Sequence, residues 1–151
     1  MEIIQWSPTL ETGIDVIDQQ HKRIVDYINA LRIAQGKGDR GEVAKTIDDV
    51  IDYTQSHFGF EEALLEDAGY PLLNAHKRVH ELFIRRVAVL HQRFKSGEDI
   101  AQDLHNVLAR WLITHIQTED RHYVGAVKEK MVGVVADQGR RKSLLARFFG
   151  A

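Results

Sequence analysis

Apolar residues recur along most of the chain at intervals of three and four residues, the spacing that places them on one face of an α-helix. The segments with this spacing cover about residues 18–35, 40–66, 72–95 and 98–131. The turn-forming sequences between them are GKGDRG at 36–41, DAGYP at 67–71 and KSGED at 95–99. No segment shows sustained β-strand alternation. Long amphipathic helices joined by short loops predict an all-α fold, an up-down-up-down antiparallel four-helix bundle.

Two shorter segments flank the predicted bundle. The N-terminal arm carries the apolar residues Ile3, Ile4, Trp6 and Leu10. A basic tail follows, in which the residues spaced for one face of a short helix are Leu144, Leu145, Phe148 and Phe149. We therefore expect a bundle domain over 1–131 and an amphipathic tail over 132–151. The tail is expected to cap the bundle, with docking to a partner protein or weak membrane-surface association as alternatives.

Composition narrows the possible functions. The 151 residues include 20 Lys+Arg, 22 Asp+Glu and no Cys. The near balance of charge gives no general attraction to nucleic acid, and the absence of Cys excludes disulfides, thiolate catalysis and Cys-held metal sites. The chain has no apolar run long enough to span a membrane and no signal-peptide pattern at its start. We expect a cytoplasmic monomer.

Seven residues of metal-binding type interrupt the apolar helix faces. They are His21, His57, Glu61, His76, His80, His115 and Asp120. The pairs 57/61 and 76/80 are four residues apart, which separates them by some 40° around a helix. His115 and Asp120 are five residues apart, some 140° around the helix, so their convergence requires the carboxylate to reach along the helix side.

Burying five imidazoles and two carboxylates is costly unless they have partners. A divalent metal such as iron, zinc or manganese would compensate for this cost, because imidazole and carboxylate are good ligands for these ions. Seven ligands exceed what one ion accepts, whereas two ions that share bridging carboxylates fit the count. The other three histidines, His91, His105 and His122, are expected to lie outside the site.

These motifs resemble those of the hemerythrin family, and in particular its single-domain bacterial members. The matching segments are QQHK (19–22), HFGFEE (57–62), HKRVH (76–80) and WLITHIQTED (111–120), together with Trp6 and GIDVID (13–18). The resemblance implies a non-haem di-iron centre with an oxo or hydroxo bridge. It places His76, His80 and His115 on one iron, His21 and His57 on the other, and Glu61 and Asp120 between the two.

The resemblance also implies reversible binding of dioxygen at the iron that has an open position. A His-rich site is expected to be more reluctant to activate oxygen than the carboxylate-rich sites of ferritin-type enzymes. We therefore expect a carrier without catalytic residues, used for storage, delivery to an oxygen-consuming enzyme, or buffering. The alternatives are an oxygen, nitric-oxide or iron sensor, a di-iron peroxidase or nitric-oxide scavenger, and a metal store. The expected oxygen pocket consists of Phe58, Trp111, Leu112 and Ile116.

Overall fold

The structure is a computed structural model that describes residues 3–133 and residue 139. The elements are the 3₁₀ helix η1 (Pro8–Leu10), the helices α1 (Asp15–Lys37), α2 (Arg40–Asp67), α3 (Leu73–Lys95) and α4 (Ala101–His115), and the π-helical turn η2 (Ile116–Asp120). Residues 121–133 continue the last helix beyond η2. No strand occurs within these described residues. Apart from residues 132, 133 and 139, the predicted tail lies outside them.

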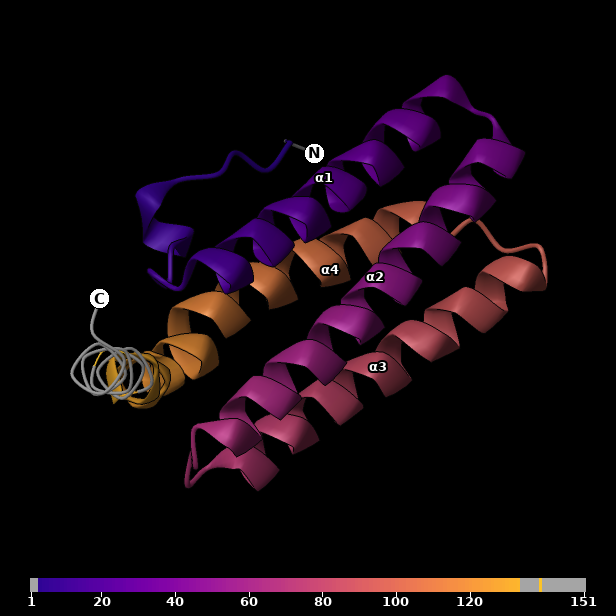
Figure 1. Ribbon diagram of the computed structural model, residues 1–151. Coiled ribbons are helices and arrows are strands. Elements are labelled where there is room, and N and C mark those ends of the chain that lie inside the picture. Colours follow the sequence, from indigo (N-terminus) through magenta and orange to yellow (C-terminus); the bar gives the residue numbers. More distant parts are fainter. Residues whose placement is uncertain (1–2, 134–138, 140–151) are drawn as a thin grey trace, which may run out of the picture.

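The four helices pack as a bundle (Figure 1). Helix α1 packs against α2 and α4, and α3 packs against the same two helices. Helices that follow one another in the chain run in opposite directions, because the turns between them are short. The predicted antiparallel four-helix bundle is therefore confirmed.

The turn between α1 and α2 shows why the helices end where the sequence predicts. Gly38 adopts a left-handed conformation with φ 72°, and its N–H donates to the carbonyl of Gln35. A side chain at this position would be strained, so glycine stops α1 at little cost. Asp39 then caps α2, since its carboxylate accepts hydrogen bonds from the N–H groups of Gly41 and Glu42.

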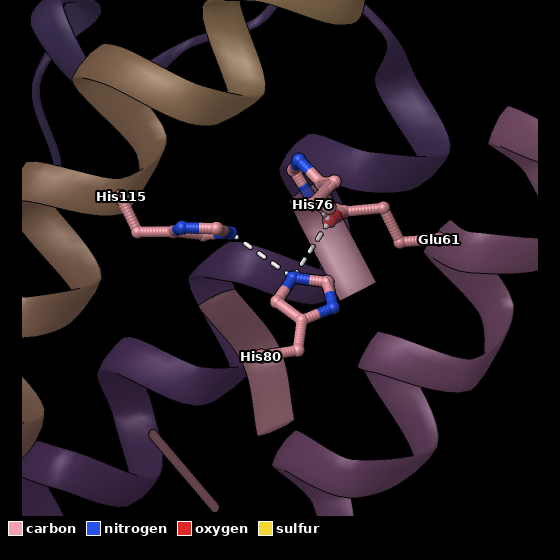
Figure 2. Close-up of side chains that lie close together, drawn as sticks. All are labelled: Glu61, His76, His80 and His115. Atoms are coloured by element: carbon pink, nitrogen blue, oxygen red, sulfur yellow. Dashed lines mark hydrogen bonds and ion pairs between the residues drawn. The ribbon is translucent and has the colours of Figure 1, made fainter. Parts of the chain in front are cut away.

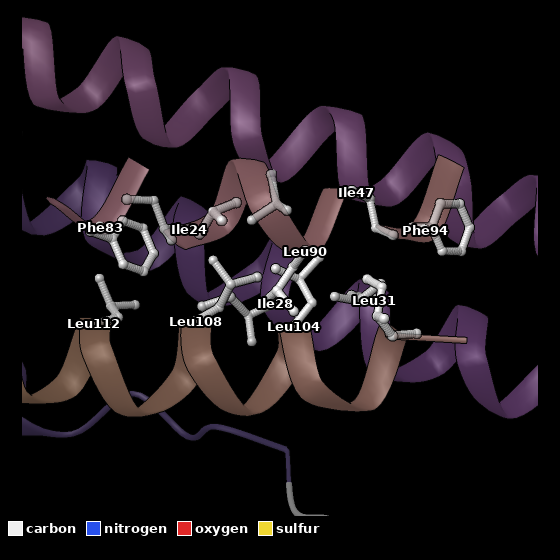
Figure 3. Close-up of a cluster of buried hydrophobic side chains, with 14 of the residues drawn as sticks. Ile24, Ile28, Leu31, Ile47, Phe83, Leu90, Phe94, Leu104, Leu108 and Leu112 are labelled. Atoms are coloured by element: carbon white, nitrogen blue, oxygen red, sulfur yellow. The ribbon is translucent and has the colours of Figure 1, made fainter. Parts of the chain in front are cut away.

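The bundle core consists of two apolar clusters. Figure 3 shows much of the larger one, in which residues such as Ile28, Leu104 and Leu108 interdigitate across the helices. The smaller cluster contains Ile14, Ile17, Leu65, Tyr123 and Val127. Among the helices of the described residues, none is both long and apolar enough to cross a membrane. In the two clusters the apolar faces of the helices pack against one another, as the periodicity predicts.

The N-terminal arm is tied to α1 at two points. The side-chain amide of Asn29 exchanges two hydrogen bonds of 2.9 Å with the backbone of Ile4. Asp18, nearly buried, accepts hydrogen bonds from the backbone and hydroxyl of Thr12 and from the backbone of Gly13. These contacts hold the arm along α1.

Candidate metal centre

All seven residues that the sequence predicts as metal ligands come together in the core. They are His21, His57, Glu61, His76, His80, His115 and Asp120, and none exposes more than 4% of its surface. They form a polar layer between the two apolar clusters. On α1, for example, His21 lies between Ile17 of the smaller cluster and Ile24 of the larger one.

Four of these residues form one group that could hold a metal ion. Figure 2 shows His76 and His80 of α3 and His115 of α4 turned toward Glu61 of α2. The Nε2 atom of His76 lies 2.6 Å from Glu61 Oε1, and the Nε2 atoms of His80 and His115 lie 3.0 Å apart. Three imidazoles and one carboxylate oxygen therefore converge on one point.

A second group of possible metal ligands shares Glu61 and adds His21 and His57. The other oxygen of Glu61, Oε2, lies 3.3 Å from His57 Nε2 and 3.9 Å from His21 Nε2. Glu61 thus turns one oxygen toward each group. A carboxylate in this position could contribute one oxygen to an ion in each group.

Asp120 repeats this arrangement with its own two oxygens. Its Oδ2 atom lies 3.2 Å from His21 Nε2, whereas Oδ1 lies 3.0 Å from His115 Nε2 and 3.5 Å from His76 Nε2. The two carboxylates therefore span the same two groups of imidazoles.

The π-helical turn explains how Asp120 reaches the site. Residues Ile116–Asp120 form i→i+5 hydrogen bonds, which widen the helix locally. In this wider turn, residues five apart lie on nearly the same face, so the carboxylate of Asp120 projects toward His115. The regular α-helix assumed from the sequence would have turned these residues some 140° apart. The chain adapts through its backbone as well as through the reach of the side chain.

Electrostatics in the site keep the carboxylates ionised. Burial alone would raise the pKa of Glu61, but hydrogen bonds from His57, His76 and His80 outweigh it and hold the pKa well below its ordinary value. The pKa of Asp120 is also lowered, because His115 and His21 outweigh burial and repulsion from Glu61.

The imidazoles respond less uniformly. Burial lowers the pKa of His57 despite the nearby Glu61 carboxylate. At His76 burial acts in the same direction but is outweighed by Glu61 and Asp120, so the pKa is raised. A metal ion at this site would therefore compete with a proton at His76.

Among the residues that the structure describes, some buried nitrogen and oxygen atoms of the site have no hydrogen-bond partner, which is expected of metal ligands rather than of a closed hydrogen-bond network. Within the described residues, both ring nitrogens of His21 and both oxygens of Asp120 are buried without a hydrogen-bond partner of good geometry. Leaving such atoms unsatisfied is costly. His21 Nε2 and the two Asp120 oxygens all face other donor atoms of the site, where a shared cation would satisfy them together.

Several outer partners of the site were not assigned from the sequence. Gln20 Oε1 lies 2.7 Å from Nδ1 of His57, and Glu62 Oε1 lies 2.9 Å from Nδ1 of His80. Such contacts fix the orientation of a ligating imidazole. Both partners stand next to a predicted ligand, in QQH and FEE, which is the only signal that the sequence contains.

Tyr123 is a further residue of the site that was not assigned from the sequence. Its fully buried hydroxyl donates a 2.9 Å hydrogen bond to Glu61 Oε2. Burial and the neighbouring carboxylates Glu61 and Asp120 raise the pKa of Tyr123, so the phenol keeps its proton and remains a donor.

The expected pocket residues lie against the imidazoles or in the core beside them. Phe58 stacks on the ring of His80, with centroids 3.8 Å apart, and Trp111 stacks on the ring of His115 at 4.2 Å. Leu112 and Ile116 are buried in the same apolar cluster as Phe58.

The three remaining histidines lie outside both groups of possible metal ligands. His91 pairs with Asp48 at 3.0 Å, and His122 is exposed. His105 is buried on α4, and neither of its ring nitrogens has a hydrogen-bond partner within the described residues.

Fold and site together define a helical bundle with groups of buried His and Glu side chains that could hold a metal ion. Residues 12–127 match the family described as "Hemerythrin HHE cation binding domain". The bacteriohemerythrin of Stenotrophomonas maltophilia (strain R551-3) is 48% identical over 153 residues, which cover 99% of this chain and 100% of the relative. The chain belongs to the hemerythrin family, so the resemblance found in the sequence is confirmed.

More distant relatives agree. The bacteriohemerythrin of Methylococcus capsulatus (strain ATCC 33009 / NCIMB 11132 / Bath) is 34% identical over 82% of this chain and 95% of the relative. The crystal structure of a wild-type hemerythrin has a TM-score of 0.79 and 31% identity, covering 83% of this chain and 98% of that one. A crystal structure of a mutant hemerythrin matches with the same TM-score.

Proposed function

We propose that this protein binds dioxygen reversibly at a non-haem di-iron centre and serves in oxygen storage, delivery or buffering. The observation that carries the proposal is the placement of the two carboxylates. Glu61 and Asp120 each turn one oxygen to His76 and the other to His21. One ion would be held by His76, His80 and His115, a second by His21 and His57, and both would share the carboxylates.

The donor set supports a carrier over an oxygen-activating enzyme. Two iron ions, when bound, would supply the two electrons that reversible binding of dioxygen withdraws and returns. Five neutral imidazoles and only two carboxylates give the ions less negative charge than the carboxylate-rich sites of ferritin-like bundles. This favours the return of electrons over further oxidation. The pair of imidazoles at His21 and His57 has one protein ligand fewer than the other group, which leaves room for a small molecule.

The residues around the donors act mainly by excluding water and fixing orientation. Phe58 and Trp111 cover the rings of His80 and His115, while Leu112 and Ile116 fill the core beside them. A dry wall slows the loss of reduced oxygen species to solvent. Tyr123 holds the bridging Glu61 by its hydrogen bond.

The proposal is tested by optical spectroscopy on the reduced, iron-loaded protein. The spectrum is recorded without oxygen, after exposure to air and after degassing, and iron is measured per chain. We expect two irons and a charge-transfer band that appears with air and disappears on degassing. Glu61→Gln should lose the two irons and the reversible band. Glu66→Gln, a substitution at an exposed position of the same helix, should keep the irons and the band. Irreversible oxidation in the first cycle, or turnover with peroxide or nitric oxide, would favour an enzyme, and a colourless zinc protein would contradict both.

A further inference from the structure

Positive charge is concentrated on one helix of the bundle. Helix α3 carries six Lys or Arg residues and a single Glu, whereas its neighbour α2 carries two Lys or Arg and eight Asp or Glu. The chain as a whole has a formal net charge of -2. The α3 side is therefore a local basic surface on a slightly acidic protein, and such local fields steer the approach of charged partners.

An open groove of about 760 Å³ lies between α3 and α4 on this side. Arg86 and Arg110 line it, and neither forms an ion pair with another described residue. Among the described residues that line the groove, Asp103 is the only one with a carboxylate. Val89 adds an apolar surface with 61% of its area exposed. A partly apolar groove with two unpaired arginines is suited to an acidic protein surface.

The groove connects directly to the candidate metal centre. Trp111 lines the groove, and its ring stacks on the ring of His115 with an interplanar angle of 14°. Its ring also stacks on Phe83, with centroids 3.9 Å apart. The Nε2 atom of His115 in turn lies 3.0 Å from both His80 Nε2 and Asp120 Oδ1, which belong to the candidate metal centre. Two stacked rings therefore join the groove to the metal ligands.

A second hollow on α3 offers a useful contrast. It is lined by His80 itself, but Lys77 and Arg78 face Glu62 and Glu81 there. Its charges balance, so it has no preference for an acidic partner. The groove between α3 and α4 combines positive charge with the ring of Trp111, which stacks on the proposed metal ligand His115.

We propose that this groove is the docking surface for an acidic one-electron donor protein, and that Trp111 passes the electron to His115 and the metal centre. The inference rests on the proposed function. A di-iron centre that has lost both electrons by autoxidation needs two electrons before it can bind dioxygen again. Each docking event would oxidise one donor by one electron and reduce one ferric ion to ferrous. No bond forms or breaks in this transfer.

The surface can first be tested without iron. In a Trp6→Phe background, Trp111 is the only tryptophan, and its fluorescence is quenched by iodide or by neutral acrylamide. We expect the ratio of iodide to acrylamide quenching to fall at least threefold in Arg86→Glu/Arg110→Glu. Lys37→Glu/Lys45→Glu, which makes the same change in net charge on α1 and α2, should keep the wild-type ratio. An equal ratio in all three proteins would contradict a positive field at the groove.

Electron transfer is then measured on the oxidised, iron-loaded protein. The probe is a reduced plant-type [2Fe–2S] ferredoxin, an acidic one-electron donor, mixed by stopped flow at several salt concentrations. We expect the second-order rate constant to fall at least tenfold in the double arginine variant, and to fall with added salt in the wild type. Trp111→Leu should keep ferredoxin binding, measured by calorimetry, but slow the rate at saturation.

The outcomes separate this inference from the proposed function. Suppose that the protein binds dioxygen reversibly but its rate constant with ferredoxin is the same in the double arginine variant as in the wild type. This result would overturn the docking surface alone. A groove-dependent rate in a protein that does not bind dioxygen reversibly would support the docking surface and contradict the carrier. Unchanged saturation rates in Trp111→Leu would overturn the electron path through that residue.

Discussion

Single residues in the core combine structural and chemical roles. Leu112 is nearly buried in the large apolar cluster, one helical turn before His115. Tyr123 belongs to the smaller cluster and also donates a hydrogen bond to Glu61. Both therefore pack the bundle and shape the environment of the donor atoms, and substitutions must separate the two effects.

Truncation of Leu112 is expected to speed autoxidation of the iron-loaded protein. Leu112→Ala opens a space beside the imidazoles that water can enter, and it lowers the free energy of unfolding by about 2–5 kcal/mol. Autoxidation, followed by the decay of the oxygenated spectrum, should be several-fold faster. Leu104→Ala removes a buried leucine of the same cluster, further along α4 from His115, and should cost similar stability without this acceleration. Equal rates in the two variants would show that the effect is one of stability.

His105 is expected to make the stability of the metal-free protein depend on pH. Burial, aided by Arg32, lowers the pKa of His105 below its ordinary value, so the folded state holds the imidazole neutral. As pH falls below about 6.5, the unfolded chain gains a proton that the folded state does not, and stability decreases by at most about 1.4 kcal/mol per pH unit.

The measurement is the free energy of unfolding in urea at pH 7.5 and 5.5. His105→Leu should lose less stability on acidification than the wild type. His122→Leu, the same substitution at an exposed position, should lose as much as the wild type. If acidification affects His105→Leu and the wild type equally, His105 does not contribute to the pH dependence.

At the scale of elements, the π-helical turn decides the register of the last helix. It brings Asp120, five positions after His115, to nearly the same face as His115, whereas a regular α-helix would place the residue four positions after His115 there. The turn therefore acts as a one-residue insertion that leaves the residues after it, including Tyr123, correctly oriented.

Deleting one exposed residue from this turn tests that interpretation. Removal of Gln117 should convert η2 into a regular α-helical turn and place the carboxylate four residues after His115, on nearly the same face. We expect retained metal stoichiometry and unchanged or higher thermal stability, measured by metal analysis and calorimetry. Deleting the exposed Arg110 from the regular part of α4 should instead rotate the rest of the helix by about 100° and abolish metal binding. Loss of metal in the Gln117 deletion would contradict the insertion model.

At the scale of the whole molecule, we expect the polar layer to make the stability of the fold depend on metal. The seven buried His, Glu and Asp side chains separate the larger apolar cluster from the smaller one. Several of their nitrogen and oxygen atoms have no hydrogen-bond partner within the described residues. Metal that binds only the folded state stabilises it by mass action, by about 4 kcal/mol at a free concentration of 1,000 times the dissociation constant.

Removing the metal should therefore lower Tm by roughly 10 °C, at about 2–4 °C per kcal/mol for a chain of this size. Calorimetry at a series of buffered free Fe²⁺ concentrations under anaerobic conditions measures this shift. Glu61→Ala should show little dependence on metal, whereas Glu66→Gln should follow the wild type. A Tm independent of metal in the wild type would contradict a metal site in the core.

Much of this architecture could be predicted because it depends on local properties of the chain. Spacing of three and four residues determines which face of a helix is buried, and Gly38 with Asp39 marks a helix end by its own conformational and hydrogen-bonding preferences. The seven donors were recognisable because polar residues on an apolar face stand out. The sequence by itself therefore determined the helices, their order and the seven residues that we propose as metal ligands.

Only the tertiary structure decided how these residues meet. The two carboxylates face both groups of imidazoles because four helices pack in one register, which spacing along one helix does not specify. The π-helical turn, the hydrogen bond from Tyr123 and the partners Gln20 and Glu62 likewise depend on contacts between helices or on a change in backbone geometry. Periodicity assumes a regular helix and describes one element at a time, so it contains no information about these contacts.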